Sequence, residues 1–446
     1  MLYLLISLLS ISSLLYSDEV IINSQLLDYD ENPIINANIY CDKKGTVSNK
    51  YGNFTLICQD NQTLVISHIN YKTLNFKTNS IPNTIYLSNN YIEIGSVKIY
   101  GSLKNKSYHD VEILDELKFK LNGKNHFQDI ISNISNLNNS GGTSRPRYFQ
   151  IRGLGELSQF AGEGPPHFYV GYILDDINFS GIGMLGLLND IKQIEIFKGP
   201  QSSIYGPNAM AGLINTISNN PNPSTEFRHS LTMESFNGVN LSTVLNLPIT
   251  KNLTSRFTLI QSRNDGYINN IYRNLDNTNS QSETLLRSKL LYKPNKSTKI
   301  NLTTYRIVLN NKYDKWSPDN NGYLTYSDYQ GYDKQKTIAS SLKSTSILEN
   351  FNIVTISSYS ENNMHYSYDG DWANNSYWLE EYNFNWQTEG YSWSFIDETF
   401  RTRITKSQEI RIEDFSIYGF VYTGGIFIQS LNEEDQRIGS LFGGDG

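Results

Sequence analysis

The stretch Ile194 to Gly206 reads IEIFKGPQSSIYG, and the residues GLIN follow it at Gly212 to Asn215. The stretch opens with β-branched and aromatic residues, which favour a strand. Gly199 and Pro200 end that strand, because glycine permits unusual backbone angles and proline donates no ladder hydrogen bond. A phosphate-binding loop would continue into Gly-Lys-Ser/Thr and a helix, and neither follows here. The stretch therefore predicts two strands joined by a Gly/Pro-rich turn, with no nucleotide site.

The surrounding region, 105–219, has a mixed pattern. Residues 129–137 predict a short helix that ends in the loop at 138–142. Glycines and prolines separate the apolar runs that come next, and such runs predict short strands. The predicted strands are 148–153, 168–176, 191–198 and 212–218.

Two more motifs stand upstream: Ile151-Arg152-Gly153, and Tyr172 to Asp176 (YILDD). Together with the opening stretch, and in this order, they resemble the signature of the plug domain of TonB-dependent outer-membrane receptors. Lys198 stands where the family usually has Arg, and Asp176 replaces the usual glycine of a turn. Lysine keeps the positive charge of arginine but cannot form a bidentate pair with a carboxylate. The departure at Lys198 therefore affects the geometry of its ion pair and not the resemblance to the family.

Residues 20–88 show short alternating segments broken by turn residues, which predicts a small β-sandwich. This part resembles the carboxypeptidase-regulatory-like domain that precedes the plug in some of these receptors. The residues that carry the resemblance are Pro33, Ala37, Ile39, Gly45-Thr46, Tyr51-Gly52-Asn53-Phe54 and His68-Ile69-Asn70-Tyr71.

From Glu226 onward the alternating segments are longer, and one face of each is polar. Thr405, Ser407 and Glu409, for example, share a face opposite Ile410. This period of two is typical of a membrane β-barrel and also of a large soluble sandwich, and the residues alone do not separate the two. The resemblance of the preceding region to a plug domain favours the membrane β-barrel over the soluble sandwich. The nine predicted strands are 226–235, 241–249, 253–266, 283–293, 298–309, 337–348, 352–360, 402–413 and 418–429.

Nine strands do not complete a bacterial barrel, because strand numbers there are even and an open edge in lipid leaves backbone groups unpaired. The resemblance implies a barrel of 22 strands. The ending at 441–446 also lacks the terminal aromatic residue that such barrels usually have. We expect the N-terminal part of a longer protein, or a truncated gene product.

Composition excludes several other classes. The chain has 446 residues, a formal charge of −7 and 13% aromatic residues. The acidic balance argues against a nucleic-acid binder, and a mean hydropathy of −0.43 argues against a bundle of membrane helices. Two cysteines and six scattered histidines lack metal-site spacing, so no metal site is predicted. Whether Cys41 and Cys58 form a disulfide stays open at this point.

Residues 1–17 predict a cleaved signal peptide, with an N-terminal anchor as the alternative. The predicted organisation is then a carboxypeptidase-regulatory-like sandwich at 18–90, a TonB-interacting linker at 91–102, a plug at 103–222 and an incomplete barrel at 223–446. The fold class is mainly β, with a small β-sandwich, a mixed α+β plug and an incomplete antiparallel transmembrane β-barrel.

The linker is extended and apolar at alternate positions, and the resemblance implies that it is the segment on which TonB acts. An extended segment can add a strand to a partner's sheet, although a plain interdomain linker has the same pattern. The residues assigned to TonB contact are Ile92, Glu93, Ile94, Val97, Lys98 and Ile99.

Two further sets of residues are candidates for function. We expect Arg152 and Lys198 to converge on Glu409, with Glu195 as a second carboxylate, and so to anchor the plug; separate hydration of all four is the alternative. An aromatic-rich stretch between two strands suits recognition of a bulky ligand, although membrane-interface girdles use the same residues. The ligand-loop candidates are Tyr366, Tyr368, Trp372, Trp378, Trp386 and Trp393.

The resemblance implies a gated transporter of the bacterial outer membrane, with the N-terminal module in the periplasm. Its partners would be TonB, outer-membrane lipid and an extracellular ligand such as an iron-siderophore complex, haem, cobalamin or a glycan. No catalytic residues and no cofactor are predicted; Asp175 and Asp176 have neither a histidine partner nor metal spacing. The competing hypothesis is an adhesin or structural β protein without active transport.

Overall fold

The computed structural model describes residues 19–87, 110–116, 125–140, 143–155, 168–182, 187–206, 208–384, 395–417 and 420–441, except single positions 30, 43 and 70. The chain divides into two compact units, residues 1–98 and residues 99–446. No helix among the described residues has the length and apolar character needed to cross a membrane. The predicted signal peptide and the TonB-contact residues Ile92, Glu93, Ile94, Val97, Lys98 and Ile99 lie outside the described residues.

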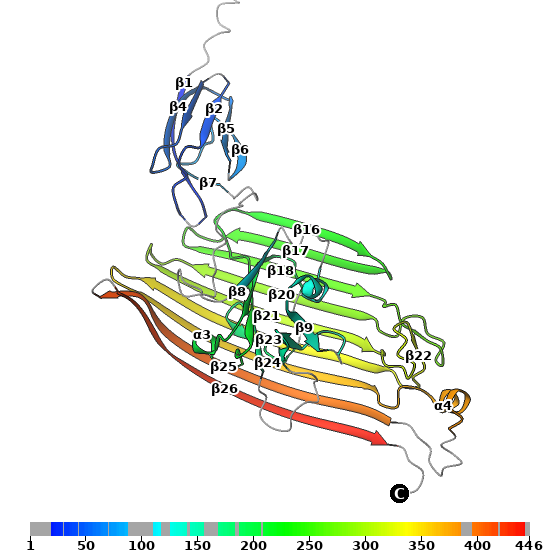
Figure 1. Cartoon of the computed structure of the whole chain (residues 1–446). Helices are drawn as coiled ribbons and strands as arrows, with labels where there is room; N and C mark the ends of the chain where they lie inside the picture. Colours follow the sequence, from blue (N-terminus) through cyan, green and yellow to red (C-terminus); the bar gives the residue numbers. More distant parts are fainter. Residues whose placement is uncertain are drawn as a thin grey trace, which may run out of the picture. The chain divides into compact units, whose positions relative to one another are not determined.

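The first unit contains a β-sandwich of two sheets, as predicted (Figure 1). One sheet has the order β4-β1-β7 and the other β3-β2-β5-β6. Alternate residues point between the sheets, so Phe54, Leu56 and Cys58 of one strand are all buried. The strands are β1 (Glu19–Leu27), β2 (Asn38–Cys41), β3 (Lys44–Val47), β4 (Asn53–Gln59), β5 (Thr63–His68), β6 (Tyr71–Lys77) and β7 (Thr84–Tyr86).

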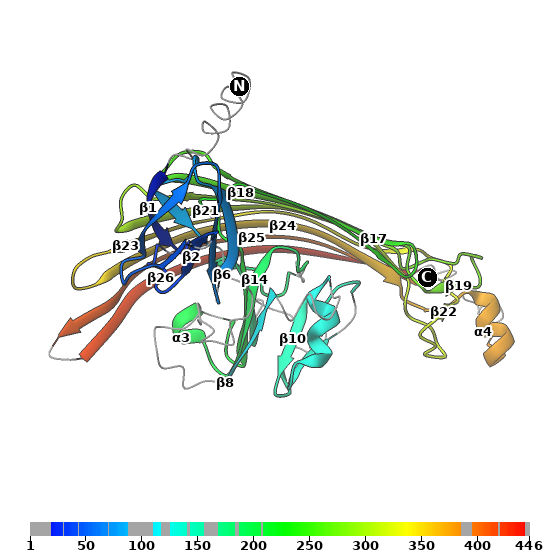
Figure 2. The same ribbon diagram turned by 90° about the horizontal axis from the view of Figure 1, so that it is seen from above.

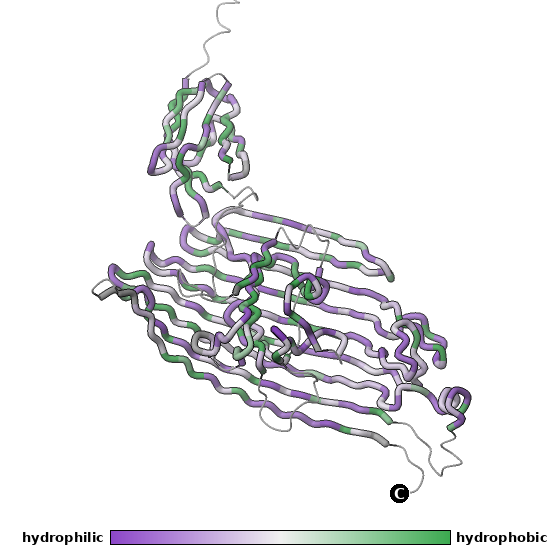
Figure 3. Tube along the Cα trace, in the orientation of Figure 1, coloured by the Kyte–Doolittle hydropathy of each residue, from purple (hydrophilic) through white to green (hydrophobic). Residues whose placement is uncertain are grey.

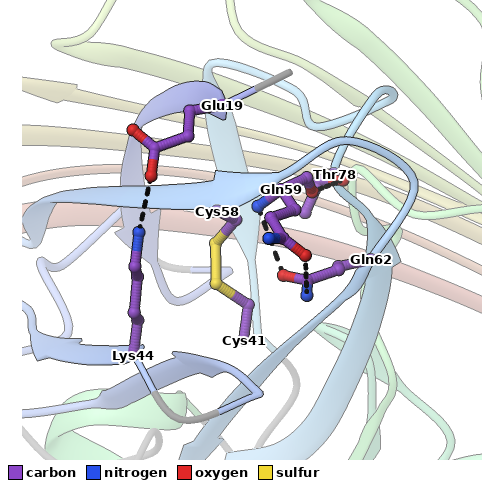
Figure 4. Close-up of a disulfide and its surroundings, with 7 residues drawn as sticks. All are labelled: Glu19, Cys41, Lys44, Cys58, Gln59, Gln62 and Thr78. Carbon is purple, nitrogen blue, oxygen red and sulfur yellow. Dashed lines mark hydrogen bonds and ion pairs between the residues drawn. A yellow bond between two sulfur atoms is a disulfide. The ribbon is translucent and has the colours of Figure 1, made fainter. Parts of the chain in front are cut away.

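A disulfide joins the two sheets of this sandwich (Figure 4). It links Cys41 at the end of β2 with Cys58 in β4, across 6.2 Å between the Cα atoms. Both cysteines are buried among the apolar residues of the core. At the nearby surface, the Lys44 Nζ lies 3.0 Å from the Glu19 Oε1, and both side chains are more than half exposed.

The middle region, which we call the plug region, contains two small sheets. A mixed five-stranded sheet has the order β13-β12-β15-β14-β8, and a three-stranded sheet has the order β11-β10-β9. The predicted helix at 129–137 is instead a 3-10 helix followed by a strand. The elements are β8 (Asp110–Asp115), η1 (Phe127–Asn133), β9 (Leu137–Ser140), β10 (Tyr148–Ile151), β11 (Leu154–Gly155), β12 (Val170–Leu174), β13 (Ile177–Asn178), β14 (Ile191–Lys198), α3 (Ser202–Tyr205) and β15 (Gly212–Ser218).

Two hairpins of the plug region have two-residue turns in which both residues have positive φ. Arg152 and Gly153 have φ of 54° and 77° between β10 and β11, and Asp175 and Asp176 have φ of 46° and 65° between β12 and β13. Such turns match the right-handed twist of the strands and favour Gly, Asn and Asp. Asp176 therefore keeps the turn although it replaces the family's usual glycine.

The remaining strands form one antiparallel sheet of nine strands, in chain order except for a two-stranded side sheet of β19 with β22 (Figure 1). All nine predicted strands are present, and several extend further than expected. Within the described residues β16 and β26 pair only on one side, so the sheet is open. The strands are β16 (Glu226–Glu234), β17 (Gly238–Pro248), β18 (Leu253–Asn264), β20 (Gln281–Tyr292), β21 (Thr298–Tyr313), β23 (Gly331–Ile347), β24 (Asn352–Asp369), β25 (Phe395–Ile417) and β26 (Phe420–Leu441), with β19 (Asn269–Asn270), β22 (Leu324–Thr325) and helix α4 (Asn375–Tyr382) in the loops.

The predicted alternation of faces is confirmed by the burial of successive residues in these strands. Figure 3 shows hydrophilic and hydrophobic residues interspersed along the same strands. In β18, Arg256 and Thr258 are buried while Phe257 and Leu259 are exposed. The plug region lies on the concave side of the sheet, which is the side of the buried polar residues (Figure 2). Its apolar core continues into inward-facing residues of the sheet, including Ile260, Leu285 and Ile307.

Candidate functional site

The plug region is fixed to the sheet by ion pairs, and the densest group surrounds Asp190. This aspartate precedes β14, has φ of 60° and is 4% exposed. Its carboxylate accepts hydrogen bonds from Arg256 of β18, with Nη2–Oδ1 and Nε–Oδ2 distances of 2.5 and 2.9 Å. Arg228 of β16 and Arg287 of β20 approach the same carboxylate at 3.0 and 3.2 Å. One plug side chain thus binds arginines from three strands.

A second group centres on the turn Asp175-Asp176. The Asp175 carboxylate lies 3.0 Å from the Lys289 Nζ of β20 and also accepts the hydroxyl of Tyr305 of β21. Asp176 pairs with Lys343 of β23 at 2.9 Å. These two carboxylates therefore anchor the plug region to three strands.

The charges around Asp175 determine its ionisation. Burial alone raises the pKa of this carboxyl, but the charges of Lys289 and Arg287 and the hydrogen bonds from Ser218 and Tyr305 outweigh burial and lower its pKa to about 2. Asp175 is therefore a carboxylate at neutral pH.

At the other end of the plug region the signs are reversed, with arginines on the plug and acids on the sheet. Arg145 makes a bidentate pair with Glu283 of β20, with N–O distances of 2.6 and 3.0 Å. Arg147 pairs with Asp333 of β23, and the Ser144 hydroxyl donates to the same carboxylate at 2.6 Å. All four charged side chains are nearly buried.

The predicted anchor set of Arg152, Glu195, Lys198 and Glu409 is arranged differently. Arg152 is exposed in the β10–β11 turn and not on a strand, because Arg-Gly supplies the two positive-φ residues of that turn. The Lys198 Nζ lies 2.7 Å from Glu112 of β8, so it pairs within the plug region. Glu409 pairs with Arg411, its neighbour on the same face of β25.

Glu195 and Glu409 nevertheless share a neighbour, Tyr205 of the Ile-Tyr-Gly motif. Glu195 is fully buried and accepts hydrogen bonds from Gln193 and Asn215 at 2.6 and 2.8 Å. Burial, and then the charges of Glu195 and Glu409 among others, raise the pKa of the Tyr205 hydroxyl well above its ordinary value. The motif that begins at Gly199 therefore faces β25, although not through the pairs that the sequence suggested.

The residues that do anchor the plug carried a partial signal. Asp175 and Asp176 stand out as paired acids, and Arg145-Pro146-Arg147 as a basic pair. Strand parity also places Arg256 on the polar face of β18. What the sequence lacks is the register between plug and sheet, since the charged partners are 38 to 186 residues apart.

The aromatic candidates divide into four groups. Tyr366 and Tyr368 lie in β24, which runs nine residues beyond its predicted end, so they are strand residues and not loop residues. Trp372 is 44% exposed and stacks on Trp316 of another loop, with 6.4 Å between the ring centroids. Trp378 lies in α4 beside Tyr377 and Tyr382. Trp386 and Trp393 lie outside the described residues.

A cavity of about 300 Å³ lies between the plug region and the sheet, at the end where the longer loops are. Plug residues Asn125 to Asp129 and Thr143 to Arg145 form one wall. Loop and strand residues form the other wall, including Phe236, Tyr267, Tyr313, Lys312 and Lys315. The cavity thus combines aromatic rings with charged groups of both signs, since Asp129, Glu234 and Arg145 line it together with the two lysines.

Comparison with known proteins identifies two families within the chain. Residues 104–213 match the TonB-dependent Receptor Plug Domain, and residues 24–99 match the CarboxypepD_reg-like domain. These are the two resemblances that the sequence motifs indicated.

Solved structures with a similar fold include receptors whose names refer to ferric chelates or siderophores. The ferric yersiniabactin uptake receptor FyuA from Yersinia pestis aligns with a TM-score of 0.62 at 16% identity, over 75% of this chain and 50% of that chain. The ferripyoverdine receptor of the outer membrane of Pseudomonas aeruginosa aligns with a TM-score of 0.58 at 11% identity, over 93% and 54%. The siderophore receptor PiuA from Acinetobacter baumannii aligns with a TM-score of 0.57 at 13% sequence identity, over 75% of this chain and 47% of that chain. The chain spans about half the length of the solved receptors it matches.

Proposed function

This chain has the plug domain, the N-terminal module and the fold of a TonB-dependent receptor, and we propose that it serves in the active uptake of a scarce, bulky ligand across the bacterial outer membrane. We propose an iron-siderophore complex as that ligand. The observation that carries the proposal is the plug region on the concave face of the sheet, held by buried ion pairs. A lumen filled in this way passes a large ligand only after the plug moves, and moving it requires energy.

The cavity at the loop end supports the ligand class. Its lysines, Lys312 and Lys315, can pair with an anionic chelate, and the exposed rings of Tyr267 and Phe236 offer flat contact area. The solved receptors of similar fold carry the names of ferric yersiniabactin and ferripyoverdine, which also favours an iron chelate over a glycan or cobalamin.

Uptake of radioactive iron by a strain that carries the complete gene tests the proposal. A panel of ferric siderophores, haem, cobalamin and oligosaccharides is supplied to cells with and without the gene, and with and without TonB. We expect gene-dependent accumulation of one iron chelate that disappears without TonB. Gene-dependent binding that needs no TonB would favour the adhesin, and accumulation of a glycan alone would overturn the iron assignment.

Charge substitutions in the cavity connect this uptake to the site. The double variant Lys312→Gln/Lys315→Gln should weaken chelate binding about tenfold, which corresponds to roughly 1.4 kcal/mol. Lys296→Gln, an exposed lysine in the short β20–β21 turn at the opposite end of the sheet, is the matched control and should bind as the wild type does. Equal binding by all three proteins would place the ligand elsewhere.

A further inference from the structure

Three aspartates from two loops meet near the ends of β23 and β24. Asp328 precedes β23, Asp369 is the last residue of β24, and Asp371 follows two residues later. One carboxylate oxygen of each lies within 4.8 Å of those of the other two. Since 41 residues separate Asp328 from Asp369, only the pairing of the strands brings this cluster together.

Asp371 is the unusual member of the cluster. Its side chain is 7% exposed, and neither carboxylate oxygen accepts a hydrogen bond from the described residues. Asp369 is also buried, but it accepts the backbone N–H groups of Asp328 and Asp371 at 3.2 and 3.3 Å. A buried carboxylate without a partner is costly, and two neighbouring carboxylates make it more so.

The positive charge of Arg273 interacts with Asp328, the least buried of the three aspartates, without forming an ion pair with it. No lysine or arginine of the described residues forms an ion pair with any of the three carboxylates. The three carboxylates lie close together, and that of Asp371 is buried without a hydrogen-bond donor, so the cluster requires either a shared proton or a bound cation.

We propose that Asp328, Asp369 and Asp371 bind a Ca²⁺ ion. The donors are all carboxylate oxygens, which hard cations prefer, and no nitrogen or sulfur ligand is in the cluster to favour a transition metal. Mg²⁺ is disfavoured because it keeps its waters and is seldom held by a cage of protein ligands alone. This inference is independent of the proposed uptake function.

The ion would clamp two loops that already touch. Tyr326 and Ala373 form an isolated β-bridge, and the Asn374 side chain donates to the Tyr326 carbonyl at 2.7 Å. Trp372, next to Asp371, stacks on Trp316 of the other loop. Neutralising the cluster would hold these contacts together, and so order the aromatic surface at the loop end of the sheet.

Terbium luminescence on the purified, detergent-solubilised full chain tests the site. Tb³⁺ replaces Ca²⁺, and excitation of Trp372 should sensitise its emission. We expect saturable emission that Ca²⁺ displaces with a Kd of about 10⁻⁴ to 10⁻³ M, as for extracellular calcium modules. Asp371→Asn should weaken binding at least tenfold, whereas Glu380→Gln, an exposed acid of the same loop, should leave it unchanged.

Thermal unfolding distinguishes the bound ion from a shared proton. With a calcium site, Ca²⁺ raises the Tm of the wild type above its value in EGTA, and the Tm of Asp371→Asn does not respond. With a shared proton, neither Tm responds to Ca²⁺, which would overturn the proposal. Equal displacement of Tb³⁺ by Mg²⁺ would overturn the calcium assignment. If Asp371→Asn does not fold, Asp328→Asn, the least buried ligand, takes its place in both assays.

Discussion

Asp190 is the residue on which the plug contacts concentrate, because three arginines of neighbouring strands share its carboxylate. Arg256 and Arg287 are each almost fully buried, so neither can be hydrated if the aspartate is lost. Breaking a buried pair by removing one partner leaves a buried charge uncompensated, and its cost is mainly that of the remaining charge.

Asp190→Asn should therefore destabilise the protein by about 3 to 5 kcal/mol. Asp265→Asn is the control, since Asp265 pairs at 3.8 Å with Arg263, whose side chain is 76% exposed, and the substitution should cost at most about 1 kcal/mol. Urea unfolding of the purified protein, followed by tryptophan fluorescence, measures both. Equal midpoints for the two variants would show that the arginines find water or other partners.

The lowered pKa of Asp175 predicts how the stability of the plug contacts depends on pH. Its pKa of about 2 lies below its ordinary value of 3.8, so the folded state favours the charged form. The contribution of Asp175 to stability is then complete above about pH 4 and is lost as the pH falls toward 2.

The urea midpoint of the wild type should fall between pH 4 and 2, and Asp175→Asn should reduce the slope in that window. Glu349→Gln, an exposed acid in the β23–β24 turn, should leave the slope as in the wild type. An unchanged slope in Asp175→Asn would assign the acid sensitivity to other carboxyls.

At the scale of elements, the turn after β14 lies against the last strands of the sheet. Gly206 ends α3 with φ of 77° and ψ of −160°, a conformation that is almost confined to glycine. A Cβ atom there would lie 2.7 Å from the Phe427 ring of β26. Backbone conformation and close packing therefore both require glycine at this position.

Gly206→Ala should cost about 1 to 3 kcal/mol in the backbone and more through the clash with Phe427. Gly153→Ala is the comparison, because Gly153 has the same φ of 77° but nothing within 4 Å of a built Cβ. Thermal unfolding should show the larger loss for Gly206→Ala. Similar losses would mean that Phe427 moves aside freely.

The disulfide is the element that fixes the two sheets of the N-terminal sandwich to each other. It closes a loop with a sequence separation of 17 residues, for which chain entropy gives about 3 kcal/mol. The double variant Cys41→Ser/Cys58→Ser should lose about this much from the unfolding of the module within the full chain. Uptake should persist, since the plug and its contacts lie in the other unit. Loss of uptake with a normally folded plug would assign the module a role in transport.

At the scale of the whole molecule, two units with separate cores are joined through a segment that is apolar at alternate positions. We propose that TonB pairs with this segment by strand addition, which depends on backbone N–H groups.

Val97→Pro removes one such N–H and should abolish uptake while ligand binding to the cell surface persists. Val97→Thr keeps the N–H and the β-branched shape, and should transport as the wild type does. Full uptake by Val97→Pro would exclude strand addition at this position.

The sequence by itself determined the nine long strands and which way their side chains face, although it predicted a helix at 129–137 where a 3-10 helix and a strand form. Alternation in β17, β18 and β25, and Gly/Pro punctuation in the plug, are local signals, so all nine strands and the plug's family were predictable from them. Only the tertiary structure decided which charges meet. Asp190 finds Arg256 at a separation of 66 residues, and Arg147 finds Asp333 at 186, while Lys198 turns to its sheet neighbour Glu112. The reason is physical: strand parity fixes a face within one strand, whereas the docking register of plug on sheet depends on packing over both surfaces at once.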